Sequence, residues 1–286
     1  SLTYRRMPDI LYWVKAKPVY TEVCNKTLCL TPEIARQVPQ DDYDLILGPH
    51  PIINSLDSAA LEEVAREKGK PLIFDSVESM YETTGGKRIG GFGEAEIFSL
   101  HACKLINGFG GGYATTNNAE LAERLKNITK FGFEFEDVVT EPLGGNFKLN
   151  EFHAAMALAN LDEVEEQIVH NKSIYDAYCT HLKEIPGVEI VLFDKEEKAG
   201  YKNIVVRFDD SWPMAIEETV ETLNAENILA RRYYYPPLHQ STSYKAEEFK
   251  VTEDLTLRLL NMPCGSFVSV DDVQKICKKL QAMARR

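Results

Sequence analysis

The sequence has no long apolar run. None of the hydrophobic stretches in its 286 residues approaches the roughly 18 residues that cross a bilayer. The first residues, 1–6, also lack the apolar core and the cleavage pattern of a signal peptide. We therefore expect no membrane association and a cytoplasmic location.

Positive charge is scarce as well. The chain carries 32 Lys and Arg residues against 44 Asp and Glu residues, a formal net charge of −12. Binding to nucleic acid or to an anionic membrane surface needs a basic face. The composition therefore argues against both partners, although a local basic pocket for a small anionic molecule is compatible with it.

The six cysteines form no metal-binding pattern. Cys24 and Cys29 are the most closely spaced pair, and no second Cys or His pair stands nearby. Structural zinc sites need four such ligands. We expect no metal, and we expect free thiols in a reducing compartment. The sequence also contains no internal repeat and no low-complexity segment.

Short apolar strands alternate with helices in the first half of the chain. Strand patterns occupy residues 44–48, 71–75 and 95–100, and amphipathic helix patterns occupy residues 57–69 and 119–131. This alternation is typical of an α/β fold with a mostly parallel sheet covered on both faces. The length suits one large domain with a smaller one.

The texture changes after residue 186. Half-exposed strand patterns at 188–192 and 203–208 precede a closing amphipathic helix at 270–283. We expect a large α/β domain over residues 1–170 and a small C-terminal α+β domain over residues 171–286.

The start of the chain is unusual. A helical pattern at residues 7–14 comes directly after the first few residues, and a β-branched and aromatic strand pattern follows at 17–23. No strand precedes the first helix. The sequence therefore gives the impression of opening in the middle of a domain.

Three polar residues follow the predicted strands in an order that suits one cofactor. Asp75 and Ser99 stand at strand ends, where ligands bind in such sheets, and Lys104 comes shortly afterwards. Pyridoxal phosphate needs an amine for a Schiff base, a carboxylate for its ring nitrogen, and hydroxyl or N–H groups for its phosphate. Each residue alone has an ordinary alternative: Lys104 as a solvated lysine, Asp75 as a helix N-cap and Ser99 as a turn cap.

Several stretches, in one order, resemble the DegT/DnrJ/StrS group of sugar aminotransferases, and the resemblance covers nearly the whole chain. They are Ser-Leu-Thr-Tyr at 1–4, Asp-Ser-Val-Glu-Ser at 75–79, Phe-Ser-Leu-His-Ala-Cys-Lys-Leu-Ile-Asn at 98–107, Gly-Gly-Asn-Phe-Lys-Leu-Asn-Glu at 144–151, Tyr-Pro-Pro-Leu-His at 235–239 and Met-Pro-Cys at 262–264.

The resemblance implies a pyridoxal-phosphate-dependent transferase of fold type I with specific residue roles. Lys104 would form the Schiff base and then shuttle a proton between substrate and cofactor. Asp75 would pair with the ring nitrogen, Glu78 would lie against the 3-hydroxyl face, and Ser99 would bind the phosphate. Tyr4 would stack on the ring, with plain core packing as its alternative.

The resemblance also implies a homodimer with shared active sites. Asn146 would reach the phosphate in the neighbouring subunit, with a helix N-cap as its alternative. Lys148 replaces the family's usual arginine and would contact an anionic part of the substrate as a point charge. His239 is a candidate substrate contact, or else a packed histidine, and His101 would lie beside the cofactor.

The resemblance predicts an aminotransferase that moves an amino group, from glutamate, to a nucleotide-linked keto-sugar. Two departures bear on this. The family normally has several dozen residues before the point matching Ser1, including a phosphate-gripping turn and a strand, and Gly110 stands where it usually has glutamate. The alternatives are a non-catalytic or truncated homologue that keeps the dimer scaffold, and a sugar dehydratase, in which histidine replaces the Schiff-base lysine.

Overall fold

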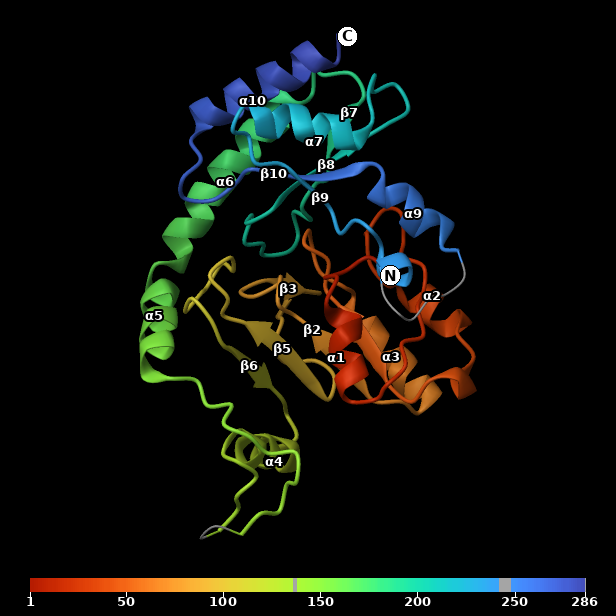
Figure 1. The fold of residues 1–286 in the computed structure, drawn as a ribbon, viewed down its shortest axis with the longest axis vertical. Coiled ribbons are helices and arrows are strands. Elements are labelled where there is room, and N and C mark those ends of the chain that lie inside the picture. The colour runs from red at the N-terminus through yellow and green to blue at the C-terminus, as the bar shows by residue number, and fades with distance from the viewer. Residues whose placement is uncertain (136–137, 242–247, 286) are drawn as a thin grey trace.

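A four-stranded sheet lies at the centre of the first half of the chain. The computed structural model describes residues 1–135, 138–241 and 248–285. Strands β1 (Ile46–Pro49), β2 (Leu72–Asp75), β5 (Ala95–Ser99) and β6 (Gly112–Thr115) form this sheet in the order β1-β2-β5-β6 (Figure 1). The first three strands are parallel and β6 is antiparallel, so the mostly parallel sheet is confirmed.

A second sheet belongs to the C-terminal half. Its strands are β7 (Val188–Ile190), β8 (Ile204–Phe208), β10 (Leu259–Met262) and β9 (Arg231–Arg232), in that spatial order and antiparallel throughout. A small hairpin, β3 (Thr83–Thr84) with β4 (Lys87–Arg88), lies near the first sheet. The predicted change, from a mostly parallel sheet in the first half of the chain to an α+β arrangement in the second, is confirmed.

Local sequence signals set the ends of several helices. The first helices are α1 (Met7–Trp13), α2 (Pro32–Gln37), α3 (Ser58–Lys68) and α4 (Ala119–Thr129), and Gln40–Asp42 forms one 3-10 turn. The Asp57 carboxylate accepts the Ala60 N–H at the start of α3, and Gly69 ends that helix in the left-handed conformation.

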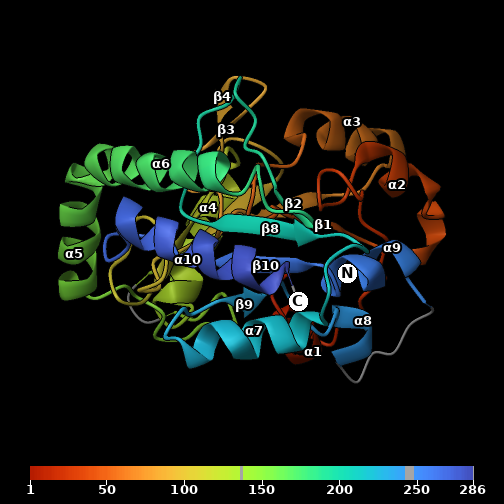
Figure 2. The same ribbon diagram turned by 90° about the horizontal axis from the view of Figure 1, so that it is seen from above.

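The long helical pattern over residues 149–182 of the sequence forms two helices, α5 (Glu151–Asp162) and α6 (Val164–His181), with a break at Glu163. The remaining helices are α7 (Ile216–Ala225), α8 (Leu238–Ser241), α9 (Lys250–Thr256) and α10 (Val270–Met283). Ser269 caps α10 in a reciprocal capping box with Asp272. In Figure 2, α10 lies alongside α6, against which it packs.

The largest hydrophobic core joins the two ends of the chain. It contains Leu2, Leu28 and Ile53 from the N-terminal part together with Ile204 and Leu260 from the second sheet. A separate core lies between α3 and the first sheet. The boundary between residues 170 and 171 falls inside α6, and it stays a prediction.

Two predicted strands differ from the structure. Residues 17–23 are extended but belong to no strand ladder, because no neighbouring strand in the described part of the chain pairs with them. The sequence also predicts a strand over residues 229–235, and of these only the two residues of β9 form one. Strand patterns record side-chain alternation, whereas a ladder also needs a partner. Among the described residues, no helix combines the length and apolar character needed to cross a membrane.

Candidate active site

The ends of two parallel strands bring the predicted residues together. β2 ends at Asp75 and β5 ends at Ser99, and the register places Asp75 opposite Ile97 on the neighbouring strand. Lys104 follows in a turn in which its N–H donates to the His101 carbonyl at 2.9 Å. The strand ends therefore place the carboxylate and the amine at the same edge of the sheet.

Asp75 is a buried carboxyl group. Its residue is 6% exposed, and its Oδ1 accepts the Val77 N–H at 3.3 Å. Burial raises the pKa of Asp75 to about 6, against the opposing effects of the Val77 N–H and the Lys104 charge. An additional positive partner at this carboxyl would stabilise its ionised form, as a protonated ring nitrogen does.

Lys104 pairs with Glu78. The Lys104 Nζ donates to Glu78 Oε1, and the two side chains are 10% and 12% exposed. The other oxygen, Oε2, accepts from Lys202 Nζ at 3.3 Å. Burial alone would raise the pKa of Glu78, but the charges of Lys202 and Lys104 outweigh it and lower that pKa. The carboxylate thus bridges two lysines.

Sequence reasoning missed Lys202 and Tyr234. Lys202 precedes β8, and Tyr234 follows β9 with a left-handed φ of 46°. The pKa of Tyr234 is raised far above its usual value by burial and by the negative charge of Glu78. The Tyr-Lys-Asn sequence at 201–203 matches no motif, so no local signal marks Lys202.

A fully satisfied carboxylate supports the end of β2. Glu96 is completely buried and accepts from Ser76 Oγ at 2.5 Å and from the Gly90 and Phe92 N–H groups at 2.7 and 2.8 Å. These bonds tie the residue after Asp75 to β5. Because every partner is buried or half-buried, they position the strand end rigidly.

The turn after β5 is also organised locally. Ser99 Oγ accepts the His101 N–H at 3.2 Å, and the His101 Nδ1 accepts the Cys103 N–H at 3.2 Å. His101 is exposed. Gly108 comes next, and a side chain there would meet the His153 carbonyl of α5 at 2.4 Å. The glycine therefore lets α5 approach the turn that carries Lys104.

The structure decides between some of the alternatives for the remaining residues. Tyr4 is 56% exposed, so the core alternative is wrong, and its stacking role stays a prediction. Asn146 is not an N-cap: Asn150 caps α5 by accepting the His153 N–H at 3.0 Å. Asn146 instead lies exposed in a bridge with Lys130.

Two predicted substrate contacts lie apart from the lysine pair. Lys148 is exposed, with its Nζ 5.7 Å from the centre of the Phe131 ring. His239 is buried, its Nε2 is 2.9 Å from Glu253 Oε1, and its ring packs edge-on against Phe249. This environment favours the packed-histidine alternative, and a substrate role for either residue stays a prediction.

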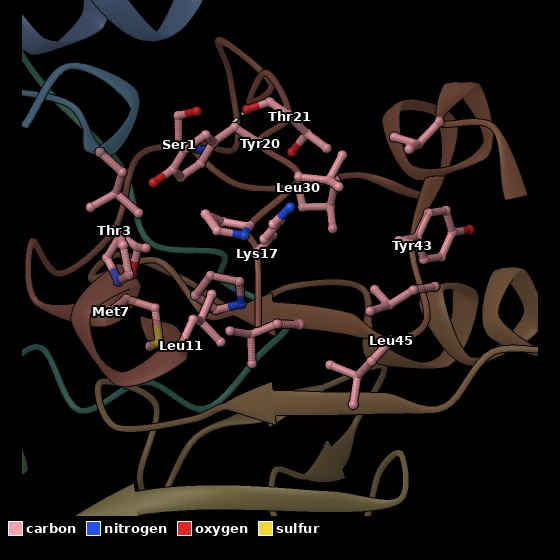
Figure 3. Close-up of a pocket in the computed structure, with 18 of the residues that line it drawn as sticks. Ser1, Thr3, Met7, Leu11, Lys17, Tyr20, Thr21, Leu30, Tyr43 and Leu45 are labelled. Carbon is pink, nitrogen blue, oxygen red and sulfur yellow. Dashed lines mark hydrogen bonds between the residues drawn. The ribbon is translucent and has the colours of Figure 1, made fainter. Parts of the chain in front are cut away.

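A cavity of about 770 Å³ lies elsewhere, beside β1. Figure 3 shows Thr3, Met7, Lys17, Tyr20 and Leu45 around it. It follows the side of β1 on which the described residues supply no strand partner. Its lining residues do not include Asp75, Glu78, Lys104 or Lys202, which we call the Lys104 group. The predicted Schiff-base lysine and its partners therefore lie outside this cavity.

The donor set fits pyridoxal phosphate. One short stretch of the first sheet holds all the groups that the cofactor needs. They are the buried carboxyl of Asp75, which a cationic partner would ionise, the half-buried Lys104, the neighbouring Glu78 and the strand-end Ser99. Among the described residues, no cluster of three or more His, Cys, Asp or Glu side chains is arranged to hold a metal ion.

Solved structures share this fold. One is that of DesI in the presence of its TDP-sugar product, with a TM-score of 0.92 and 30% identity over 100% of this chain and 74% of that one. Another is a sugar aminotransferase from Streptococcus pneumoniae in its PLP form, with a TM-score of 0.88 and 16% identity over 99% and 78%. The fold and site define the class of pyridoxal-phosphate-dependent aminotransferases of fold type I.

Within that class, residues 1–281 match the DegT/DnrJ/EryC1/StrS aminotransferase family, and the chain belongs to it. A relative from Shigella dysenteriae, dTDP-4-amino-4,6-dideoxy-D-glucose transaminase, is 23% identical over 93% of this chain and 73% of its own length. Another, from Streptoalloteichus tenebrarius, is an L-glutamine:2-deoxy-scyllo-inosose aminotransferase. It is 30% identical over 58% of this chain and 42% of its own length.

Proposed function

We propose that this chain transfers an amino group from glutamate to the keto group of a nucleotide-linked sugar. The observation that carries the proposal is the buried group of Asp75, Glu78 and Lys104 at the ends of β2 and β5. The family and the nucleotide-sugar names of its relatives support the acceptor class. The glutamate donor rests on the family resemblance alone.

Each residue of the group has a task that its position supports. Pyridoxal phosphate, when bound, supplies an electron sink for the bond changes at the substrate carbon. Asp75 would hold a proton on the ring nitrogen, since its carboxylate is ionised above pH about 6. Lys104 would carry the cofactor and then move a proton at its Nζ, which Glu78 holds in place.

The proposed enzyme is a homodimer that shares its sites. Helix α5 contains no buried residue, and it stands at the edge of the subunit in Figure 1. Apolar side chains are exposed on it and on the segment before it: Phe152 at 86%, Leu143 at 83% and Phe147 at 64%. Asn146 and Lys148 lie within this same surface. A second copy of the chain would cover it and receive both residues.

Borohydride labelling tests the proposal directly. The purified chain is incubated with pyridoxal phosphate, reduced, digested and analysed by mass spectrometry. We expect the label on Lys104 in the wild type, and no label at that position in Lys104→Ala. Lys87→Ala, which alters an exposed lysine of β4, is the matched control. A label on a different lysine, or none, would overturn the assignment and favour the non-catalytic homologue.

A substrate panel then tests the reaction. Nucleotide-linked keto-sugars are supplied with glutamate or with glutamine, and amino-sugar formation is measured. We expect turnover with glutamate. Turnover with glutamine alone would correct the donor, and loss of a hydroxyl without amination would favour the sugar dehydratase.

A further inference from the structure

The segment that carries Lys202 is joined to the first half of the chain. Lys198 exchanges two hydrogen bonds with Thr83: the Thr83 N–H donates to the Lys198 carbonyl at 3.1 Å, and Thr83 Oγ1 accepts the Lys198 N–H at 2.8 Å. Two residues on, the Gly200 N–H donates to Glu82 Oε1 at 3.2 Å. Lys202, after two more residues, reaches Glu78. Tyr201, within this segment, has a left-handed φ of 48°, so the segment is not a regular strand. The three contacts together form a seam between residues 198–202 and residues 78–83.

The same segment is held from its other side. The Asn171 side chain donates to the Gly200 carbonyl at 3.2 Å, and the Asn203 side chain donates to the Ile52 carbonyl at 3.4 Å. The Tyr201 ring packs against the rings of Phe193 and Tyr175, with centroids 4.7 and 5.3 Å away. The backbone on both sides of Lys202 is therefore anchored, and its side chain is only 21% exposed.

We propose that Lys202 is a positioning residue of the active site, which keeps Glu78 ionised and in place while Lys104 is bonded to the cofactor. The proposal rests on the role of Lys104 given above. In the structure, Glu78 offers one carboxylate oxygen to each lysine. When the Lys104 nitrogen is engaged elsewhere, Lys202 remains as the cationic partner of Glu78.

The charges around Glu78 show why such a partner is needed. Glu78 has a side chain that is only 12% exposed, and a buried carboxylate without a partner is costly. Asp75 is a second acid near Glu78. Glu82 is a third, and burial raises its pKa to about 8. The phenol of Tyr234 and the thiol of Cys264 also face this group, and both stay protonated at neutral pH because burial raises their pKa values. Only Lys104 and Lys202 bring positive charge to Glu78, as far as the described residues show.

Three variants test the proposal: Lys202→Met, which keeps the length and removes the charge; Lys202→Arg, which keeps the charge; and Lys275→Met, an exposed control lysine on α10. Cofactor affinity is measured by absorbance titration of the cofactor-free chain. The pH midpoint of the lysine-bound cofactor band is measured separately. Neither readout depends on turnover.

We expect Lys202→Met to weaken cofactor binding about tenfold and to move the spectral midpoint up by about one pH unit, because removing a nearby cation favours protonated forms. Lys202→Arg should restore most of both properties, and Lys275→Met should match the wild type. A folded Lys202→Met chain with unchanged affinity and midpoint would overturn the proposal.

A double-mutant cycle separates charge pairing from loss of packing. In Glu78→Gln the carboxylate is absent, so adding Lys202→Met should weaken binding by less than about twofold more. Equal losses in both backgrounds would overturn the pairing and indicate a structural role. Borohydride labelling of wild-type Lys104 keeps the two proposals apart. If Lys104 labels normally and the Lys202 variants match the wild type, only this inference fails, whereas absence of the label refutes the proposed function itself.

Discussion

The Lys104 group and the cavity beside β1 differ in what surrounds them. The cavity has a volume of about 770 Å³ and is lined mainly by apolar side chains from the first 49 residues, with Lys17 among them. The Lys104 group has Asp75, Glu78 and Lys202 within charge or hydrogen-bond range. The cavity lining also includes charges of both signs, on Lys15, Lys17, Asp42 and Asp44, whereas the charges of the Lys104 group are paired and mostly buried at strand ends. The candidate site is therefore marked by paired charges and not by cavity volume.

The largest effect should come from Lys104→Ala. Without the amine, cofactor attachment and proton transfer both disappear, so we expect amino-sugar formation to fall by roughly 10³-fold or more. The measurement is the initial rate with a keto-sugar nucleotide and glutamate at saturating cofactor. A variant that retains more than about a tenth of the activity would contradict the central role of this group.

Complementation between inactive variants should follow next in size. In the proposed homodimer, Lys104→Ala and Asn146→Ala would each damage a different half of a shared site. Co-refolded mixtures should recover about a quarter of wild-type activity, because half of the dimers are mixed and each mixed dimer has one intact site. Sedimentation of each variant alone, as a dimer, is the control. Recovery no greater than the sum of the two variants would refute the shared site.

A pH-dependent stability difference should mark Asp75. Burial raises the pKa of Asp75 from 3.8 to about 6, so the folded state binds more protons than the unfolded state between these values. The free energy of unfolding therefore falls as the pH rises through that range. In the cofactor-free chain, Asp75→Asn should therefore be more stable than the wild type by about 2 kcal/mol at pH 7, and nearly equal to it at pH 4. Urea unfolding at several pH values measures the difference. A gap that is constant with pH would contradict the buried, ionised carboxylate.

The smallest effect should come from the cavity. Lys17→Met removes one of its charged lining residues, an exposed lysine. We expect the free energy of unfolding to change by less than about 0.5 kcal/mol, and the cofactor affinity to stay within about twofold. Thermal unfolding and absorbance titration check these values. A large loss of cofactor affinity would link the cavity to the Lys104 group and contradict the separation of the two regions.

Signals that act over a few residues were predictable from the sequence. The helices predicted at 57–69 and 270–283 are confirmed as α3 and α10, with N-caps at Asp57 and Ser269 and with Gly69 at the end of α3. Each depends on hydrogen bonds within one turn, which local sequence specifies. Residues 17–23 failed as a strand because a ladder depends on a neighbour that the local pattern does not describe.

Strand patterns and short motifs are local properties of the chain, so the fold class, the family and the order of Asp75, Ser99 and Lys104 were predictable from the sequence. The bridge that Glu78 forms between two lysines is visible only in the folded chain. Lys202 stands 124 residues from Glu78 in the chain, and the seam between Thr83, Glu82 and the segment before β8 brings them together. Such a pairing depends on how two sheets pack, so spacing along the chain carries no sign of it.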